Sequence, residues 1–88
     1  MMIDKFLQYL RYERNYSAKT VESYGEDLVA FESYFIKIDD HLSFESVDSD
    51  VIRDWMESMM DKGNNATSIN RRLSALRSFY RFALSRHL

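Results

Sequence analysis

The stretch from Ser68 to His87 carries five arginines and no acidic residue. Placed at about 100° per residue on a helical wheel, its polar residues gather on one side: Asn70, Arg71, Ser74, Arg77, Ser78 and Arg81. A guanidinium group can fork onto phosphate or guanine, and short hydroxyl and amide groups reach backbone oxygens of a nucleic acid. The same composition also fits a solvated helix face, because most runs of charge are solvated. Both interpretations stay open from these residues alone.

The other side of the same wheel is apolar and predicts a helix that is buried along one face. Its members are Ile69, Leu73, Leu76, Phe79, Tyr80 and Ala83. Gly63 is a natural stop for the preceding helix, and Asn64 or Asn65 is expected to cap a helix from about Ala66 to Ser85.

The overall charge of -2 conceals a strong separation of charge along the chain. Residues 39 to 61 carry eight acids against the single base Arg53, whereas residues 62 to 88 carry six bases and no acid. The sequence therefore argues against a generic polyanion binder and for one basic element in an acidic protein.

Three further helices are predicted, with no alternation of period two long enough for a strand. The first runs from about Ile3 to Arg14. The second begins after Ser17 as N-cap, with Tyr16 and Val21 as a hydrophobic staple. Its core stripe is Val21, Tyr24, Leu28, Phe31 and Phe35.

A connector of about a dozen residues is expected from Ile36 to Val47, with Leu42 and Phe44 in the core. Asp48 then caps the third helix. The expected buried face of that helix is Val51, Ile52, Trp55, Met56 and Met59. With 88 residues, 45% of them hydrophobic, the chain predicts one compact all-α four-helix domain.

No constellation typical of an active site or a metal site is found. His41 and His87 lack metal-ligand spacing, and the neighbouring acids Asp39 and Asp40 are expected to be solvated. We therefore expect no catalytic residue, no metal and no cofactor in this chain.

Three features of the sequence bear on the compartment of the protein. The chain has no cysteine, which fits a reducing compartment, and its start lacks the pattern of a secretory signal. Apolar runs reach only about four residues, far short of the ~20 that span a bilayer. We expect no membrane segment and a cytoplasmic location.

A longer pattern extends along nearly the whole chain. It comprises Phe6-x-x-Tyr9-Leu10-x-x-Glu13-Arg14-x-Tyr16-Ser17-x-x-Thr20-x-x-x-Tyr24-x-x-Asp27-Leu28-x-x-Phe31, then Val47 to Trp55, then Ser68 to Phe82. This pattern resembles the N-terminal core-binding domain of tyrosine recombinases, the group of phage integrases and Xer-type recombinases. The resemblance implies a SAM-like helical bundle over residues 1–88.

The resemblance also implies a function. In that family this domain lies across one face of duplex DNA, with its second and fourth helices toward the major groove, while a C-terminal catalytic domain closes a C-shaped clamp. Carried over by position, and with Arg81 added from the wheel, the implied DNA contacts are Ser17, Lys19, Thr20, Ser23, Asn70, Arg71, Ser74, Arg77 and Arg81. The implied partners are double-stranded DNA, the protein's own catalytic domain and other recombinase subunits on paired sites.

The family's catalytic tyrosine and its assisting residues belong to that catalytic domain, which is absent from this chain. We therefore expect no DNA cleavage by these 88 residues alone.

Several alternatives stay open. Ser17 and Thr20 have a second explanation in helix capping. Arg72, beside the core stripe, is placed to pair with an acid of the third helix. Phe82, Leu84 and Leu88 extend the apolar character toward a partner domain, and Met60 is suited to surface contact. In the rival interpretation the bundle is a protein-interaction module that uses its acidic segment.

Overall fold

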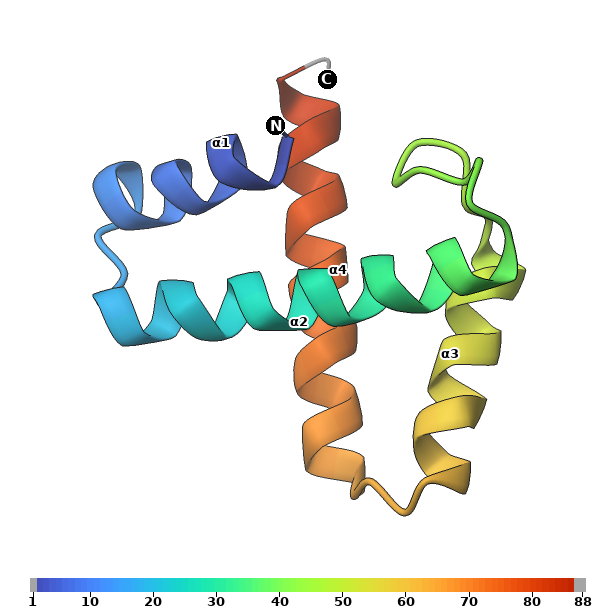
Figure 1. The fold of residues 1–88 in the computed structure, drawn as a ribbon. Helices are drawn as coiled ribbons and strands as arrows, with labels where there is room; N and C mark the ends of the chain where they lie inside the picture. The colour runs from blue at the N-terminus through green and yellow to red at the C-terminus, as the bar shows by residue number, and fades with distance from the viewer. Residues whose placement is uncertain (1, 87–88) are drawn as a thin grey trace.

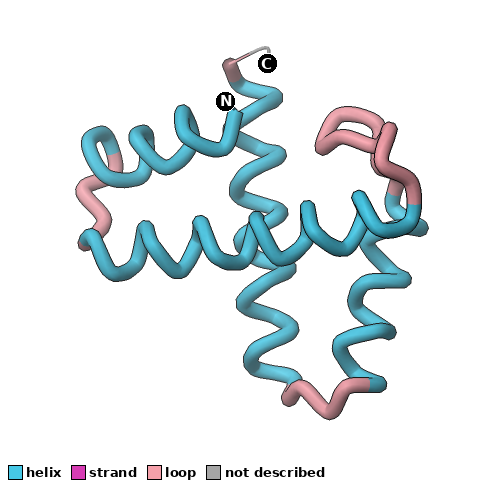
Figure 2. The backbone as a smooth tube through the Cα atoms, in the orientation of Figure 1, coloured by secondary structure: helices cyan, strands magenta, loops and turns pink. Residues whose placement is uncertain are grey.

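The computed structural model describes residues 2–86, and all regular secondary structure in them is helical (Figure 1). Helix α1 spans Met2–Gln8 and continues as a π-helical segment, η1, over Tyr9–Glu13. Helices α2, α3 and α4 follow at Ala18–Ile38, Ser49–Asp61 and Ala66–Ser85. Within these residues no strand occurs, as Figure 2 shows. The predicted all-α, four-helix fold is confirmed.

Two long helices cross at the centre of the domain. In Figure 1, α2 passes across the middle of α4, and the two pack against each other. Helix α1 lies beside the first part of α2 and against the C-terminal half of α4, while α3 descends beside the N-terminal half of α4. The N-terminal end of α2 and the polar face of α4 thus belong to one cross-shaped framework.

Each predicted N-cap forms. The Ser17 hydroxyl accepts the Thr20 backbone N–H at 3.2 Å, and the Asp48 carboxylate accepts the N–H groups of Asp50 and Val51. For α4 the structure selects Asn65, whose side-chain oxygen accepts the Ser68 N–H at 2.8 Å. Gly63 lies at the start of the α3–α4 turn with φ +85°, a conformation that favours glycine.

The geometry of the first helix and the end of the second differ from the sequence prediction. The first helix leaves α geometry after Gln8, and the chain turns at Asn15, whose φ is +57°, with the Tyr16 N–H bound to the Leu10 carbonyl. The prediction that the connector begins at Ile36 was wrong. Helix α2 continues to Ile38 because its backbone hydrogen bonds do, the last of them from Asp39 N–H to the Phe35 carbonyl.

The core is built largely from phenylalanine. Phe6, Phe31, Phe35 and Phe79 are at most 1% exposed. Phe6 contacts Phe79 edge to face, and Phe31 contacts Phe35 in the same way. Phe44 of the connector is also buried, as predicted, and packs on Phe31, Phe35 and Phe79. The predicted core members of the helices are all buried or half-buried.

The apolar residues near the end of α4 differ in their burial. Phe82 is buried within the domain against Phe6 and Tyr9, so it needs no partner. Leu84 is 80% exposed and Met60 is 59% exposed. Leu88 and His87 lie outside the described residues.

Candidate nucleic-acid interface

Helix α4 presents the polar face that its sequence predicted. Asn70, Arg71, Ser74, Arg77 and Arg81 are all exposed. Ile69, Leu76, Phe79 and Ala83 are buried on the opposite side of the helix. The burial of this apolar stripe against α1 and α2 fixes the rotation of α4 and therefore the direction of its arginines.

The crossing of α2 and α4 brings predicted residues from both helices together. Thr20 and Ser23 of α2 line one surface hollow of about 210 Å³ with Arg71 and Ser74 of α4. Tyr24, Asp27 and Ala75 complete its lining. Residues of α2 and α4 that are at least 44 positions apart in the chain thus form one surface with four hydroxyl groups and a guanidinium group.

The remaining predicted residues flank this hollow. Ser17 is exposed just before α2, and Lys19 is exposed in its first turn. Asn70 and Arg77 are exposed on α4. Arg81, one turn further along α4, lines a second hollow of about 250 Å³ with Arg14, Tyr16 and Ser78. We call the nine predicted residues together the α2–α4 face.

Ser17 and Thr20 already have structural roles. The Ser17 hydroxyl caps α2 and also donates to the Thr20 hydroxyl at 2.9 Å. The capping explanation is therefore confirmed for Ser17, and its side chain remains exposed beside Lys19.

Sequence reasoning missed Asp27 as a member of this surface. Its carboxylate is 4% exposed, and its Oδ1 accepts a hydrogen bond from Arg71 Nη2 at 2.9 Å. A signal was present, because Asp27 falls three residues after Tyr24 and four before Phe31, on the core stripe of α2. A charged residue at such a position is almost never buried unless it is paired.

Arg72 corrects one expectation. Its Nε lies 3.7 Å from the same Asp27 Oδ1, so its acidic partner belongs to α2 and not to the third helix. Toward α3 it contacts apolar groups: Nη1 donates to the Met59 sulfur at 3.4 Å, and the guanidinium lies 6.0 Å from the Trp55 ring centroid. Arg72 is a packing residue of the α2–α3–α4 junction.

The exposed arginines of α4 differ in their partners. Arg71 is paired with Asp27, whereas over residues 2–86 neither Arg77 nor Arg81 takes part in an ion pair. An unpaired guanidinium keeps its full attraction for an anion.

Burial raises the pKa of Tyr24, and neighbouring Tyr16 adds to the shift, so this phenol beside the hollow stays neutral at physiological pH.

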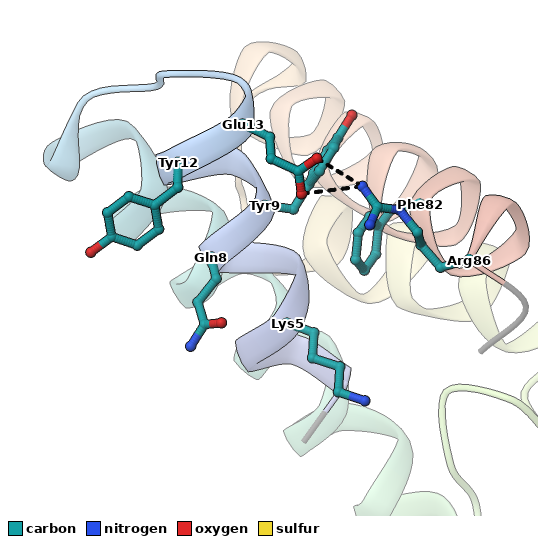
Figure 3. A pocket seen from close by; sticks show the side chains of 7 residues that line it. All are labelled: Lys5, Gln8, Tyr9, Tyr12, Glu13, Phe82 and Arg86. Atoms are coloured by element: carbon teal, nitrogen blue, oxygen red, sulfur yellow. Dashed lines mark hydrogen bonds and ion pairs between the residues drawn. The ribbon is translucent and has the colours of Figure 1, made fainter.

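A separate cluster of side chains joins η1 to the C-terminal end of α4 (Figure 3). Arg86 reaches from the end of α4 to both carboxylate oxygens of Glu13, at 3.1 and 3.2 Å. Its guanidinium also lies 5.3 Å from the ring centroids of Tyr9 and Phe82. The surrounding hollow of about 420 Å³ also includes Lys5, Gln8 and Tyr12. These contacts hold η1 against α4.

Three neighbouring polar residues of the connector lie close together at the surface. Ligand atoms of Asp39, Asp40 and His41 lie within 4.8 Å of one another, yet all three residues are exposed. His41 Nδ1 lies 3.3 Å from Asp39 and 3.1 Å from Asp40. The predicted solvation of Asp39 and Asp40 is confirmed. In the described part of the chain no helix is long and apolar enough to cross a bilayer.

Comparison with known proteins identifies the domain. Residues 3–87 match the family described as phage integrase, N-terminal SAM-like domain. The chain belongs to this family. The match of this SAM-like domain covers every residue of the α2–α4 face.

The relatives are Xer-type tyrosine recombinases. The SAM-like domain is 41% identical over 99% of its length to tyrosine recombinase XerC of Pediococcus pentosaceus, and 37% identical over 94% to XerD of Rickettsia bellii. It is 40% identical over 91% to XerC of Pelotomaculum thermopropionicum. It covers 29%, 27% and 28% of these three proteins, so it spans less than a third of their length. No solved structure matches it significantly.

Proposed function

We propose that this SAM-like domain binds double-stranded DNA through the α2–α4 face. The observation that carries the proposal is the exposure of Arg71, Arg77 and Arg81 along one side of α4, beside the hydroxyl groups of Thr20 and Ser23. Arginines anchor phosphates or guanine edges, and hydroxyls hydrogen bond to the sugar-phosphate backbone. The family of the domain and the names of its relatives favour the same partner.

The shape of this face fits a groove. Helix α4 is 20 residues long, and α2 crosses it near the middle (Figure 1). Arg77 and Arg81 lie about one turn apart on α4, and Arg71 lies nearly two turns before Arg77. An α-helix fits the major groove of B-DNA. We infer that α4 and the start of α2 face the major groove and that acids of α3 point elsewhere.

The wider role is that of one half of a recombinase clamp. The domain holds one face of the duplex, a catalytic domain holds the other, and neighbouring subunits meet on paired sites during site-specific recombination and integration. On this proposal the DNA-cleaving tyrosine lies outside these 88 residues, and the domain contributes binding and no bond-breaking step. The cytoplasm is the compartment that suits this role.

Affinity should be modest and strongly dependent on salt. With about five phosphate contacts, the slope of log K against log salt concentration is roughly -4 to -5. The dissociation constant for a non-specific duplex should lie near 10⁻⁴ to 10⁻⁶ M.

Charge reversal tests the proposal. Arg77→Glu and Arg81→Glu should each weaken binding to a fluorescent 20-base-pair duplex by on the order of tenfold at low salt. Arg53→Glu is the matched control, because Arg53 is also an exposed helical arginine but lies on α3. Equal effects at all three positions would remove the α2–α4 face from the proposal. Self-association of the domain without any response to DNA would favour a protein-interaction role.

A further inference from the structure

Asp27 is the one charged residue that is buried within the described part of the chain, and its partner is an arginine of the proposed DNA face. The Asp27 Oδ1 to Arg71 Nη2 distance is 2.9 Å, whereas the Arg71 side chain is 57% exposed. One nitrogen of the guanidinium is therefore held by a buried carboxylate, while more than half of the Arg71 side chain stays exposed.

Anchoring changes what Arg71 can recognise. The carboxylate offsets its charge, which lowers its attraction to phosphate, a largely electrostatic ligand. The free N–H groups keep their direction and their planar fork, and the side chain loses less conformational entropy when it forms directional hydrogen bonds. Arg77 and Arg81, with no ion pair over residues 2–86, keep their full charge for phosphate.

We propose that Asp27 positions Arg71 to hydrogen bond to the guanine edge in the major groove, while Arg77 and Arg81 bind phosphate. Arg71 is then the specificity-determining residue of the face, and Asp27 is its positioning residue. The hollow beside them carries the hydroxyl groups of Thr20, Ser23 and Ser74, which are further hydrogen-bonding groups next to the Arg71 guanidinium. This inference rests on the proposed DNA-binding function.

The free protein provides a first test that needs no DNA. Side-chain ¹⁵N NMR should show restricted rotation of the Arg71 guanidinium compared with Arg77 and Arg81, and Asp27→Asn should remove the restriction. Equal mobility of all three arginines in the wild-type protein would overturn the positioning role of Asp27.

The second test asks whether Arg71 contacts guanine. We would compare binding to a duplex made only of G·C pairs with the same duplex carrying 7-deazaguanine, which lacks the N7 acceptor. Wild-type protein should bind the modified duplex on the order of fivefold more weakly. Arg77→Gln should weaken binding to both duplexes while keeping this ratio. Arg71→Lys, which keeps the charge but loses the planar fork, should lower the ratio toward one.

Asp27→Asn completes the set. It should lower the ratio of the affinities for the G·C duplex and the 7-deazaguanine duplex toward one. It should also steepen the slope of log K against log salt concentration by about 0.9, because the freed Arg71 becomes a phosphate ligand. Asp54→Asn, the same charge change on an exposed residue of α3, should alter neither quantity. If Asp27→Asn fails to fold, Arg71→Lys still decides the guanine contact.

These outcomes distinguish the guanine contact of Arg71 from DNA binding by the domain as a whole. A ratio of one in the wild-type protein, with Arg77→Gln still weakening binding, would overturn the guanine contact and leave DNA binding intact. Absence of any binding would overturn the proposed function and the guanine contact together, while the NMR of the free protein would still decide the pairing of Asp27 with Arg71.

Discussion

The Tyr80 hydroxyl of α4 donates a hydrogen bond to the backbone carbonyl of Phe44 at 2.6 Å. This bond fixes the connector between α2 and α3 to the C-terminal half of α4. It also places the Phe44 ring within the aromatic core, 4.9 Å from the Phe79 ring centroid. A single polar contact thus supports the burial of a connector residue.

Tyr80→Phe should lower the free energy of unfolding by about 1 kcal/mol at pH 7, since the Phe44 carbonyl loses its donor. Urea unfolding followed by circular dichroism measures the change. Tyr12→Phe is the control, because Tyr12 is 76% exposed and should be neutral. An equal loss for both variants would contradict the role of the bond.

The same residue makes stability dependent on alkaline pH. Burial raises the pKa of Tyr80 to about 12, above the ordinary value of 10.0 that it regains on unfolding. The unfolded chain therefore loses this proton first, so the stabilising contribution is complete below about pH 10 and is lost as the pH rises through 12. Tyr80→Phe should flatten the fall in stability between pH 10 and 12. Part of the fall in stability should remain, because burial also raises the pKa values of Tyr24 and Tyr34. An unchanged pH profile would contradict this assignment.

Ser17→Asp separates capping from DNA contact. Aspartate caps a helix as well as serine does and adds a negative charge at the helix N-terminus, so thermal stability should be unchanged or slightly higher. Beside the phosphates proposed to lie near Lys19, that charge should weaken duplex binding by on the order of tenfold. Ser49→Asp adds the same charge to the first turn of α3 and serves as the control. If both variants bind as the wild type does, Ser17 lies outside the interface.

Gly63→Ala tests the turn between α3 and α4. With φ at +85° and no atom within 4 Å of an added Cβ, the cost is purely conformational and should be about 1 kcal/mol. Gly63→Asn should cost less, because asparagine tolerates this conformation better. Urea unfolding that finds alanine neutral would contradict the turn geometry.

The Arg86 and Glu13 pair should contribute little by itself. Both side chains are about half exposed, and such pairs typically have a coupling energy of about 0.5 kcal/mol. A double-mutant cycle with Arg86→Gln and Glu13→Gln measures that coupling. Arg86→Gln also removes the guanidinium from the Tyr9 and Phe82 rings, so this single substitution should cost more than the coupling energy with Glu13. A cost no larger than that coupling energy would exclude a contribution from the rings.

Much of the fold was predictable because its signals are local. The caps Ser17 and Asp48 and the apolar stripes of α2 and α4 lie within single helices, where sequence spacing determines which side chains share a face. The end of α2 was not predictable in the same way. Ile36, Lys37 and Ile38 add no buried residue, and only the continuing backbone hydrogen bonds keep them helical.

The site was predictable only within each helix. The wheel placed Arg71 and Arg77 on the polar face of α4, and both are exposed there. Pairing between helices was not predictable, since Asp27 and Arg71 are 44 residues apart and meet only because α2 crosses α4. The misassigned partner of Arg72 has the same cause: its position relative to α2 depends on the crossing, which no local pattern contains.

The most direct test of the central claim is a two-dimensional amide NMR titration of this domain with a short duplex at low salt. The proposed function predicts shifts confined to Ser17 through Ser23 and to Asn70 through Arg81, with the α3 residues Ser49–Asp61 unchanged. Shifts centred on α3, or none at millimolar duplex, would contradict DNA binding through the α2–α4 face.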